Sequence, residues 1–372
     1  MRTAKKDILL LISLVGVYSC SGNVDYSSST GISSSTDTSV SFTSNDSDDD
    51  SNNVYSSDQN AKDGSPANGG FTYTITWKNQ DGTILKIDEC QAYVTPLYSG
   101  PTPQKAGEGD LVFVFSGWTP ALVPAVSDQT YTAMFASYGI DDLYDFQYSS
   151  EYDGYMLTGK SSMQSLNTTA LSLPSHYDGE EGEKPVVGLS GSAFANFTKI
   201  KEIDLPEGLK YIGEKAFYDC FSLTDMDLPD DVETIGPYAF GYCSKLQTIA
   251  LSESLRVIDT SAFFYCSSLK SIAIPDDTET IGDFVFAYCS SLYSVSIGSS
   301  LTTIGNNAFI YDTSLTYFLI PASVTTMGEK VFAYCYNLFN IYCEAASQPS
   351  GWDKQWRSFC GAKIYWGYNA NE

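Results

Sequence analysis

The chain has 372 residues, of which 43% are hydrophobic and 14% aromatic, with 27 Tyr and 20 Phe. At roughly 100–200 residues per domain, this length indicates two or three folded units. A formal net charge of −25 repels polyanions and argues against nucleic-acid binding, while a single histidine, His176, argues against His-based catalytic triads and His-rich metal sites.

Residues 1–20 are predicted to be a lipoprotein signal peptide. A basic end with Arg2, Lys5 and Lys6 precedes an apolar run, residues 8–17, that is shorter than the roughly 20 residues of a membrane-spanning helix. The run ends in Val17-Tyr18-Ser19-Cys20, which resembles the bacterial lipobox. This resemblance implies a lipid on Cys20 and attachment to a membrane through it. Ordinary signal cleavage, with Cys20 incidental, is the alternative.

Residues 21–68 are predicted to be a disordered Ser- and Asp-rich tether. Between Ser21 and Pro66 the chain contains 15 Ser and eight Asp, with very few apolar residues. Such a composition cannot bury enough apolar surface to offset the entropy lost on folding. The segment would hold the folded part of the protein away from the membrane.

Residues 69–138 are predicted to form a small β module. Phe71, Tyr73, Ile75 and Trp77 alternate with threonines, the period of a half-buried strand, and the turn at residues 79–82 leads into a second strand. Further strands are expected near residues 111–115 and 130–135.

This module resembles the Listeria-Bacteroides and internalin B-repeat modules of bacterial surface proteins. The residues that carry the resemblance are Tyr73-Thr74-Ile75-Thr76-Trp77, Asp81-Gly82-Thr83, Phe115-Ser116-Gly117-Trp118-Thr119-Pro120 and Tyr131-Thr132-Ala133. It implies a β-grasp-like spacer with no chemistry of its own. Burial of Trp77 and Trp118 is expected rather than ligand binding, and Cys90 is expected to be a lone thiol.

A repeat of 23 residues dominates the rest of the chain. It is marked by a column of phenylalanines without one slip in spacing: Phe194, Phe217, Phe240, Phe263, Phe286, Phe309 and Phe332. A fixed period of this length predicts a solenoid in which each coil is stable only against its neighbours.

One coil, from Leu223 to Cys243, illustrates the pattern. Leu223, Met226 and Leu228 point inward along a strand, and Pro229 ends it because proline cannot donate to a strand ladder. The glycine that recurs after the isoleucine, Gly236 in this coil, is expected to allow a tight turn with positive φ.

The repeated motif Leu-x-x-Ile-x-Ile-Pro, Ile-Gly, Ala-Phe-x-x-Cys resembles the BspA-type (Treponema pallidum type) leucine-rich repeat. The resemblance implies a mainly β solenoid of 23-residue coils across residues 191–344. Residues 144–190 are expected to be an N-terminal cap with a degenerate repeat, and residues 345–372, with Trp352, Trp356 and Trp366, a C-terminal cap.

The cysteines of the repeat form a column that could be chemical or structural. Zinc needs four ligands around one point, whereas a column presents them along a line. Packing as small buried side chains is therefore the preferred interpretation, with adjacent-coil disulfides and metal binding as alternatives. The column consists of Cys220, Cys243, Cys266, Cys289 and Cys335, with Asp312 in the place of a sixth cysteine.

The outward strand positions change from acidic to aromatic along the solenoid and supply the candidate ligand-binding residues. An exposed aromatic patch of this kind marks interaction sites. Whether the patch is free or covered by the C-terminal cap stays open. Its residues are Tyr293, Tyr317, Leu319, Phe339 and Tyr342. A second column is expected to be a structural ladder on the opposite side: Tyr242, Tyr265, Tyr288, Tyr311 and Tyr334.

No catalytic constellation is present in the sequence, and no enzyme activity, cofactor or metal is predicted. His176 is expected to lie in a surface loop. The resemblance to BspA-type proteins implies a surface-tethered adhesion module, with host extracellular-matrix or microbial surface proteins as partners. Capture of glycans by the aromatic patch, or a purely structural spacer, are the alternatives.

Overall fold

The computed structural model describes residues 71–108, 111–166 and 168–369. Within this part the chain is mainly β, as predicted. The α-helix α1 (Ile140–Leu143) and a 3-10 helix (Ser161–Ser165) are short. The predicted signal peptide, the lipid-attachment residue Cys20 and the tether of residues 21–68 lie outside the described residues.

The first sheet contains four strands: β1 (Thr72–Lys78), β2 (Ile84–Gln91), β3 (Leu111–Thr119) and β4 (Gln129–Gly139). Their order is β2-β1-β4-β3, with β1 and β4 parallel in the centre and both outer pairs antiparallel. This is the strand arrangement of a β-grasp sheet, with extended chain rather than a helix over residues 92–108.

An aromatic cluster forms the core of this sheet. Trp77 is fully buried, its ring centroid lies 5.1 Å from that of Tyr131 and 4.7 Å from that of Trp118, and its Nε1–H donates to Asp88 Oδ2 at 3.0 Å. The period-2 pattern of β1 therefore places Trp77 inward, and burial of this tryptophan is confirmed. Cys90 is a free, buried thiol.

The chain then enters the start of the solenoid. A hairpin of β5 (Tyr144–Ser149) and β6 (Gly154–Gly159) is antiparallel, and β6 pairs in parallel with β9 (Gly182–Leu189). Strand β7 (Ala170–Ser172) pairs with the next coil. The repeat thus begins before residue 191, and the β5–β6 hairpin closes this end of the ladder.

The residues inserted into this first coil form a second hairpin. Strand β8 (His176–Gly179) pairs antiparallel with the first half of β9. His176 is exposed there, and its Nδ1 lies 3.1 Å from Ser175 Oγ. Its predicted surface position is confirmed.

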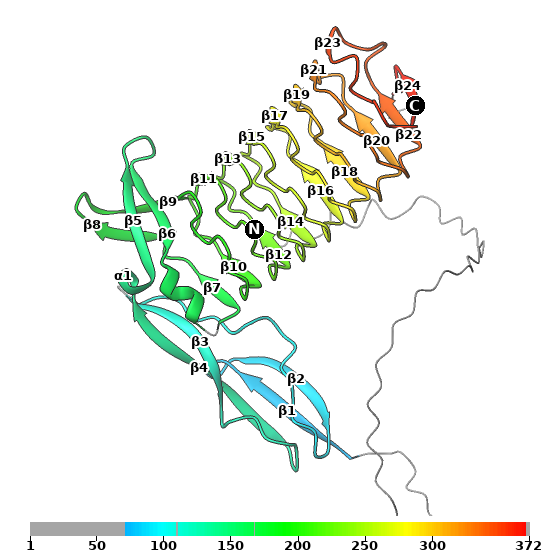
Figure 1. Ribbon diagram of the computed structural model, residues 1–372. Helices are drawn as coiled ribbons and strands as arrows, with labels where there is room; N and C mark the ends of the chain where they lie inside the picture. The colour runs from blue at the N-terminus through cyan, green and yellow to red at the C-terminus, as the bar shows by residue number, and fades with distance from the viewer. Residues whose placement is uncertain (1–70, 109–110, 167, 370–372) are drawn as a thin grey trace, which may run out of the picture. The chain divides into compact units, whose positions relative to one another are not determined.

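Each regular coil contributes one strand to each of two series, on two sides of the stack (Figure 1). The first series contains the leucine-rich strands, which pair in parallel in short sheets: β10 (Glu202–Asp204), β12 (Asp225–Asp227), β14 (Thr248–Ala250), β16 (Ser271–Ile274), β18 (Ser294–Ile297), β20 (Tyr317–Ile320), β22 (Asn340–Cys343) and β24 (Lys363–Trp366). We call its outward surface the strand face.

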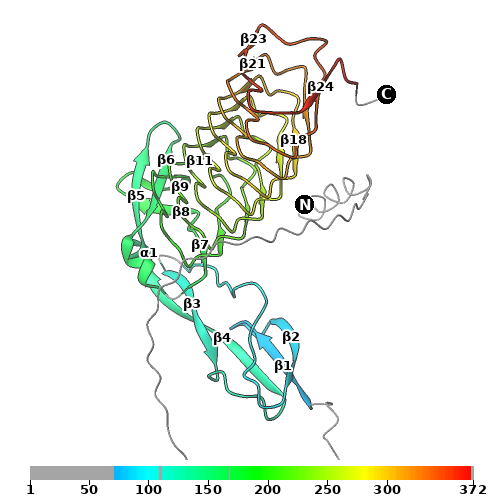
Figure 2. The ribbon, with the colours of Figure 1, turned by 45° about the vertical axis from the view of Figure 1, so that its right-hand side comes forward.

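The second series continues the sheet of β9 as a parallel ladder of two-residue strands. Figure 2 shows the successive coils from a second direction. Every pair from β11 to β21 keeps the 23-residue register, as in Ile235 beside Ile258. The strands are β11 (Tyr211–Ile212), β13 (Thr234–Ile235), β15 (Val257–Ile258), β17 (Thr280–Ile281), β19 (Thr303–Ile304), β21 (Thr326–Met327) and β23 (Gly351–Trp352).

A third ladder of hydrogen bonds runs through the turns that carry the phenylalanines. The N–H of Phe217, for example, donates to the carbonyl of Ala239 in the next coil at 2.7 Å. The rings of successive phenylalanines stack inside the core, with centroids 5.2 to 5.7 Å apart. Three ladders on three sides, together with this ring stack, hold each coil to its neighbours.

The expectation of positive φ at the repeated glycines is wrong. Gly213, Gly236, Gly282, Gly305 and Gly328 are not among the residues with positive φ. The left-handed positions are instead the residues two before and two after each phenylalanine, such as Tyr238 (φ 54°) and Tyr242 (φ 62°) around Phe240.

Close approach of coils explains these glycines. A Cβ at Gly305 would come 2.4 Å from the carbonyl carbon of Gly282 and 2.5 Å from the backbone nitrogen of Asp283 in the preceding coil. Only a residue without a side chain fits beneath the next turn at this separation.

The C-terminal segment covers the last regular coil by adding a further coil to it. Strand β23 pairs with β21, and β24 continues the strand series beside β22, with Tyr342 opposite Tyr365 at the same 23-residue spacing. Trp352 and Trp356 are buried, and the Trp356 ring lies 6.2 Å from Phe332 at 78°, which ends the parallel ring stack.

Candidate functional site

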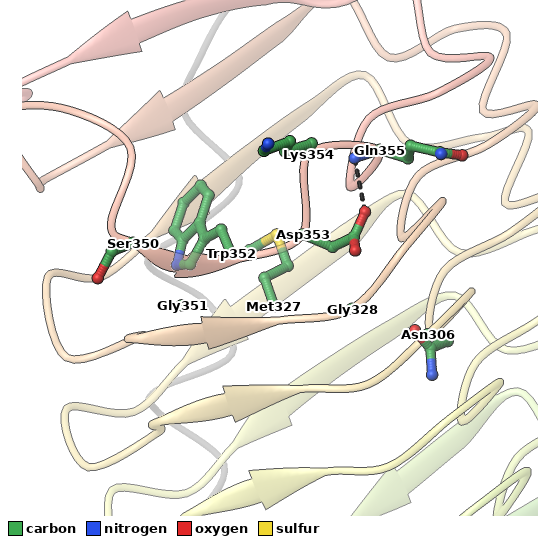
Figure 3. Close-up of a pocket in the computed structure, with 9 residues that line it drawn as sticks. All are labelled: Asn306, Met327, Gly328, Ser350, Gly351, Trp352, Asp353, Lys354 and Gln355. Carbon is green, nitrogen blue, oxygen red and sulfur yellow. Dashed lines mark hydrogen bonds between the residues drawn. The ribbon is translucent and has the colours of Figure 1, made fainter.

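The described residues contain no cluster of His, Cys, Asp and Glu side chains that could hold a metal ion. Figure 3 shows an open hollow of about 580 Å³ beside β21 and β23, at the C-terminal end of the two-residue ladder. Its one carboxylate, Asp353, accepts a hydrogen bond from the N–H of Gln355 at 2.7 Å, and Lys354 extends along its rim. Neither side chain lies beside a nucleophile or a second carboxylate in a way that indicates catalysis.

The strand face carries the predicted ligand-binding residues on three consecutive coils. Tyr293, Tyr317 and Phe339 are 53%, 47% and 62% exposed. Tyr293 precedes β18, Tyr317 begins β20 opposite Asn340 of β22, and Phe339 precedes β22. We call these three residues, together with the half-buried Leu319 and Tyr342, the aromatic patch.

The C-terminal coil contacts one edge of the aromatic patch. The ring of Tyr342 stacks on Tyr365 with centroids 5.0 Å apart, and Tyr368 lies 4.7 Å from it. Tyr293, Tyr317 and Phe339 stay exposed, because the C-terminal segment extends the stack. Tyr365 and Tyr368 enlarge the patch and were missed from the sequence, although the spacing of 23 residues from Tyr342 to Tyr365 could have identified the first of them.

The opposite end of the strand face is acidic. Glu202 and Asp225 are register partners in adjacent coils, flanked by Asp204 and Asp227. Partial burial, and then the charge of Asp225, raise the pKa of the Glu202 carboxyl. The predicted change from acidic to aromatic along this face is present in the structure.

The tyrosine column lies on the turn side of the coils and forms a stack of rings. Tyr288, Tyr311 and Tyr334 are 4.8 and 4.6 Å apart between successive centroids, with interplanar angles of 14° and 19°. Phe359 continues this stack at 5.2 Å. Because neighbouring rings cover one another's faces, the column is a structural ladder, as expected, and offers few free faces to a ligand.

The cysteine column is buried and unoxidised. All five of its cysteines are free thiols. Each Sγ lies 2.9 to 3.2 Å from the carbonyl oxygen of the phenylalanine 26 residues earlier and donates to it. Burial raises the pKa of these thiols, to about 12 for Cys220. The preferred interpretation as packing thiols agrees with this geometry, which adds a hydrogen bond that sequence reasoning missed.

Asp312 takes the place of a cysteine in this column. Its side chain is fully buried, its Oδ1 accepts a hydrogen bond from the N–H of Cys289 at 2.9 Å, and its Oδ2 has no partner among the described residues. Burial raises the pKa of this carboxyl well above its usual value, with a further contribution from Cys289. The neutral acid is therefore the form that this site favours.

None of the described helices is both long and apolar enough to cross a membrane. No curated protein matches the chain. The sequence model of the BspA type leucine rich repeat region matches residues 183–279 and 257–349, in six copies.

Solved structures of bacterial leucine-rich repeat proteins are similar to the chain. A leucine-rich cell surface protein from Faecalibacterium prausnitzii is 29% identical with a TM-score of 0.50, over 57% of this chain and 55% of that one. A protein from Bacteroides ovatus is 25% identical (TM-score 0.44; 61% and 70% covered), and the T. pallidum leucine-rich repeat protein is 30% identical (TM-score 0.41; 54% and 79% covered).

The chain thus spans about half the length of the F. prausnitzii protein. The β1–β4 sheet lies outside the residues that the family model matches, so its resemblance to B-repeat modules stays a prediction. The 23-residue coils, the matched repeats and the similarity to bacterial repeat structures lead to one conclusion. The chain belongs to the BspA-type leucine-rich repeat family.

Proposed function

We propose that the protein is a cell-surface adhesion and recognition module that binds host or microbial surface proteins through the aromatic patch. Leucine-rich repeat surface proteins of this family point to protein binding in general and are generally not enzymes. The choice of the patch, and of host or microbial partners, is our proposal.

The exposure of Tyr293, Tyr317 and Phe339 on consecutive coils carries this proposal. Large aromatic side chains lose apolar surface to water when exposed, and protein interfaces concentrate their binding energy in such residues. The parallel strands beneath hold the three residues at fixed spacing on a rigid surface, which lowers the entropy lost on binding.

Glycan binding is the second candidate for the same surface. No ring contact is found between Tyr293, Tyr317 or Phe339 and any aromatic residue that the structure describes, unlike the rings of the tyrosine column. Free ring faces can pack against the apolar faces of sugars. A purely structural spacer remains the outcome if the protein binds neither class of ligand.

Binding of the full chain to a panel of extracellular-matrix and bacterial surface proteins, beside a glycan array, tests the proposal. Any ligand that binds is then measured with the double variant Tyr317→Ala, Phe339→Ala. Loss of these two side chains should weaken binding at least tenfold, since hot-spot aromatics contribute about 2 kcal/mol or more each.

The matched control is Tyr336→Ala. Tyr336 is 70% exposed and close to Phe339 in sequence, but it lies beside Tyr334 of the tyrosine column. Equal effects of the control and the double variant, or unchanged binding by the double variant, would show that the patch is not the site.

We also propose that Cys20 carries a lipid that anchors the protein to a bacterial membrane. The lipobox-like sequence before Cys20 supports this proposal. Metabolic labelling with a fatty-acid analogue should label the wild-type chain and not Cys20→Ala. Protease treatment of intact cells then distinguishes an outward-facing protein, which is digested, from a periplasmic one, which is protected.

A further inference from the structure

The last coil leaves a second hollow, of about 460 Å³, at the C-terminal end of the solenoid. In the preceding coils, side chains at the corresponding positions are covered by the next coil, as Phe332 is covered by Trp356. No further coil follows within the described residues. The hollow is lined by Gln348, Trp356, Arg357, Lys363, Ile364 and Trp366, and its volume is within the roughly 300–1,000 Å³ of small-molecule sites.

The aromatic side chains give this hollow an apolar floor. Trp356 is almost fully buried against Phe332 and Trp352. Trp366 is 36% exposed and lies 5.7 Å from Trp352. The indole of Trp366 is thus supported on one side and open on the other, as is needed to receive the flat apolar face of a ligand.

The polar groups that line the hollow are all hydrogen-bond donors. Arg357 and Lys363 carry only donors. The amide of Gln348 is oriented by Trp356, whose Nε1–H donates to Gln348 Oε1 at 3.3 Å. This bond occupies the acceptor of the amide and leaves its NH₂ group to donate. A ligand that satisfies this set must be rich in acceptors.

The local charge also differs from that of the chain as a whole. Residues 301–372 contain four Lys or Arg and five Asp or Glu, so they contribute −1 to the net charge of −25. No carboxylate lines the hollow. Neither Arg357 nor Lys363 forms an ion pair with a residue that the structure describes, and the Lys363 ammonium lies 4.7 Å from the centroid of the Tyr365 ring.

We propose that this hollow is a binding site for a hexuronic acid residue of a glycan, with the carboxylate held by Arg357 and Lys363 and the sugar ring packed on Trp366. A planar guanidinium binds a carboxylate through two parallel hydrogen bonds. The Gln348 amide donates to a ring hydroxyl. This site is distinct from the aromatic patch and does not depend on the proposed function of that patch.

A second copy of the chain is a poorer occupant of the hollow. Two such ends brought face to face would place Arg357 and Lys363 of one copy against the same cations of the other. The repulsion between them opposes this dimer, whereas it favours a ligand with a negative charge.

The test is ligand-observed NMR with the full chain and four sugars. D-glucuronate and D-galacturonate should bind, and D-glucose and D-galactose, which differ only at the carboxylate, should bind at least tenfold more weakly. Acetate at the same concentration should not displace the uronates, because it lacks the ring that packs on Trp366.

Three variants assign the binding to this hollow. Arg357→Ala should weaken uronate binding about tenfold or more, because it removes charge-assisted hydrogen bonds. Arg357→Lys, which keeps the charge but not the planar fork, should give an intermediate loss. Lys354→Ala is the matched control, since it removes one positive charge from the same end of the solenoid but lines the hollow of Figure 3.

The proposal is overturned if neither uronate binds, if the neutral sugars bind equally, or if acetate competes as well as a uronate. It is also overturned if Lys354→Ala weakens binding as much as Arg357→Ala, because the effect would then be one of general charge. Arg357→Ala should leave any binding of proteins to the aromatic patch unchanged, so the two proposals fail separately.

Discussion

The thiol of Cys243 donates a hydrogen bond to the carbonyl oxygen of Phe217, with 3.1 Å between Sγ and O. The same oxygen accepts a second bond from the N–H of Cys220 in its own coil. Each column cysteine therefore joins two coils at a buried carbonyl, in addition to filling space. This explains why a small hydrophobic residue with a donor suits the position.

Replacement of one column cysteine should test the importance of this bond. Cys266→Ala removes the thiol that donates to Phe240 and leaves a small cavity. We expect the free energy of unfolding to fall by about 1–3 kcal/mol. Urea unfolding followed by circular dichroism measures the change. Cys360→Ala, at a half-buried thiol, should cost less, and equal losses for both variants would contradict the role of the bond.

The reactivity of the thiols should follow their burial. Burial raises the pKa of the column thiols, and the thiolate is the reactive form, so these cysteines should resist iodoacetamide in the folded protein. Cys360 should react earlier, because Arg357 partly offsets the rise in its pKa. Mass spectrometry of digested protein measures the order. After unfolding, fewer than six free thiols would contradict the packing interpretation.

Asp312 should make stability depend on pH. Its pKa is raised in the folded state, so the folded protein binds this proton more tightly than the unfolded chain does. The contribution of Asp312 to stability is therefore complete below the unfolded pKa of about 4 and is lost as pH rises above it. Asp312→Cys should raise the melting temperature, by more at about pH 7.5 than at about pH 4.

Asp312→Asn is the control for this prediction. Asn keeps the acceptor for the N–H of Cys289 and supplies a donor at the position of Oδ2, but it does not titrate. Its melting temperature should exceed that of the wild type at about pH 7.5. A difference between wild type and either variant that is the same at both pH values would mean that ionisation of Asp312 is not involved.

Close packing of the coils predicts a strong effect of Gly305→Ala. Its new Cβ would lie within 2.5 Å of backbone atoms of the preceding coil, so the two coils must separate. We expect a loss of about 2 kcal/mol or more in the free energy of unfolding. The control is Gly361→Ala, where a Cβ would meet no atom within 4 Å and φ is not positive. Similar melting temperatures for both variants would exclude the packing explanation.

Much of the fold follows from spacing alone, because a solenoid repeats one local solution. The unbroken stride from Phe194 to Phe332 fixes which residues stack, and the strand pattern of Leu223 to Leu228 fixes which point inward. A single coil read in isolation is also enough to identify the outward positions, and this is why Tyr317 and Phe339 were found.

The features that sequence reasoning missed depend on distances between coils. Nothing in the sequence separates a glycine required for positive φ from one required for close approach, so Gly305 was assigned the wrong reason. The changed spacing from Phe332 to Trp356 hid the last coil, and with it Tyr365 and the donors around Trp366. The site of Arg357 and Lys363 arises only where the stack ends.

The constant register of the coils makes the solenoid a ruler as well as a scaffold. Each coil of 23 residues adds about 4.8 Å between the hairpin that closes one end and the aromatic patch near the other. Duplication or deletion of one whole coil would keep every ladder partner equivalent and would change only this length. The reach of the aromatic patch can therefore be adjusted in equal steps without a change in its chemistry.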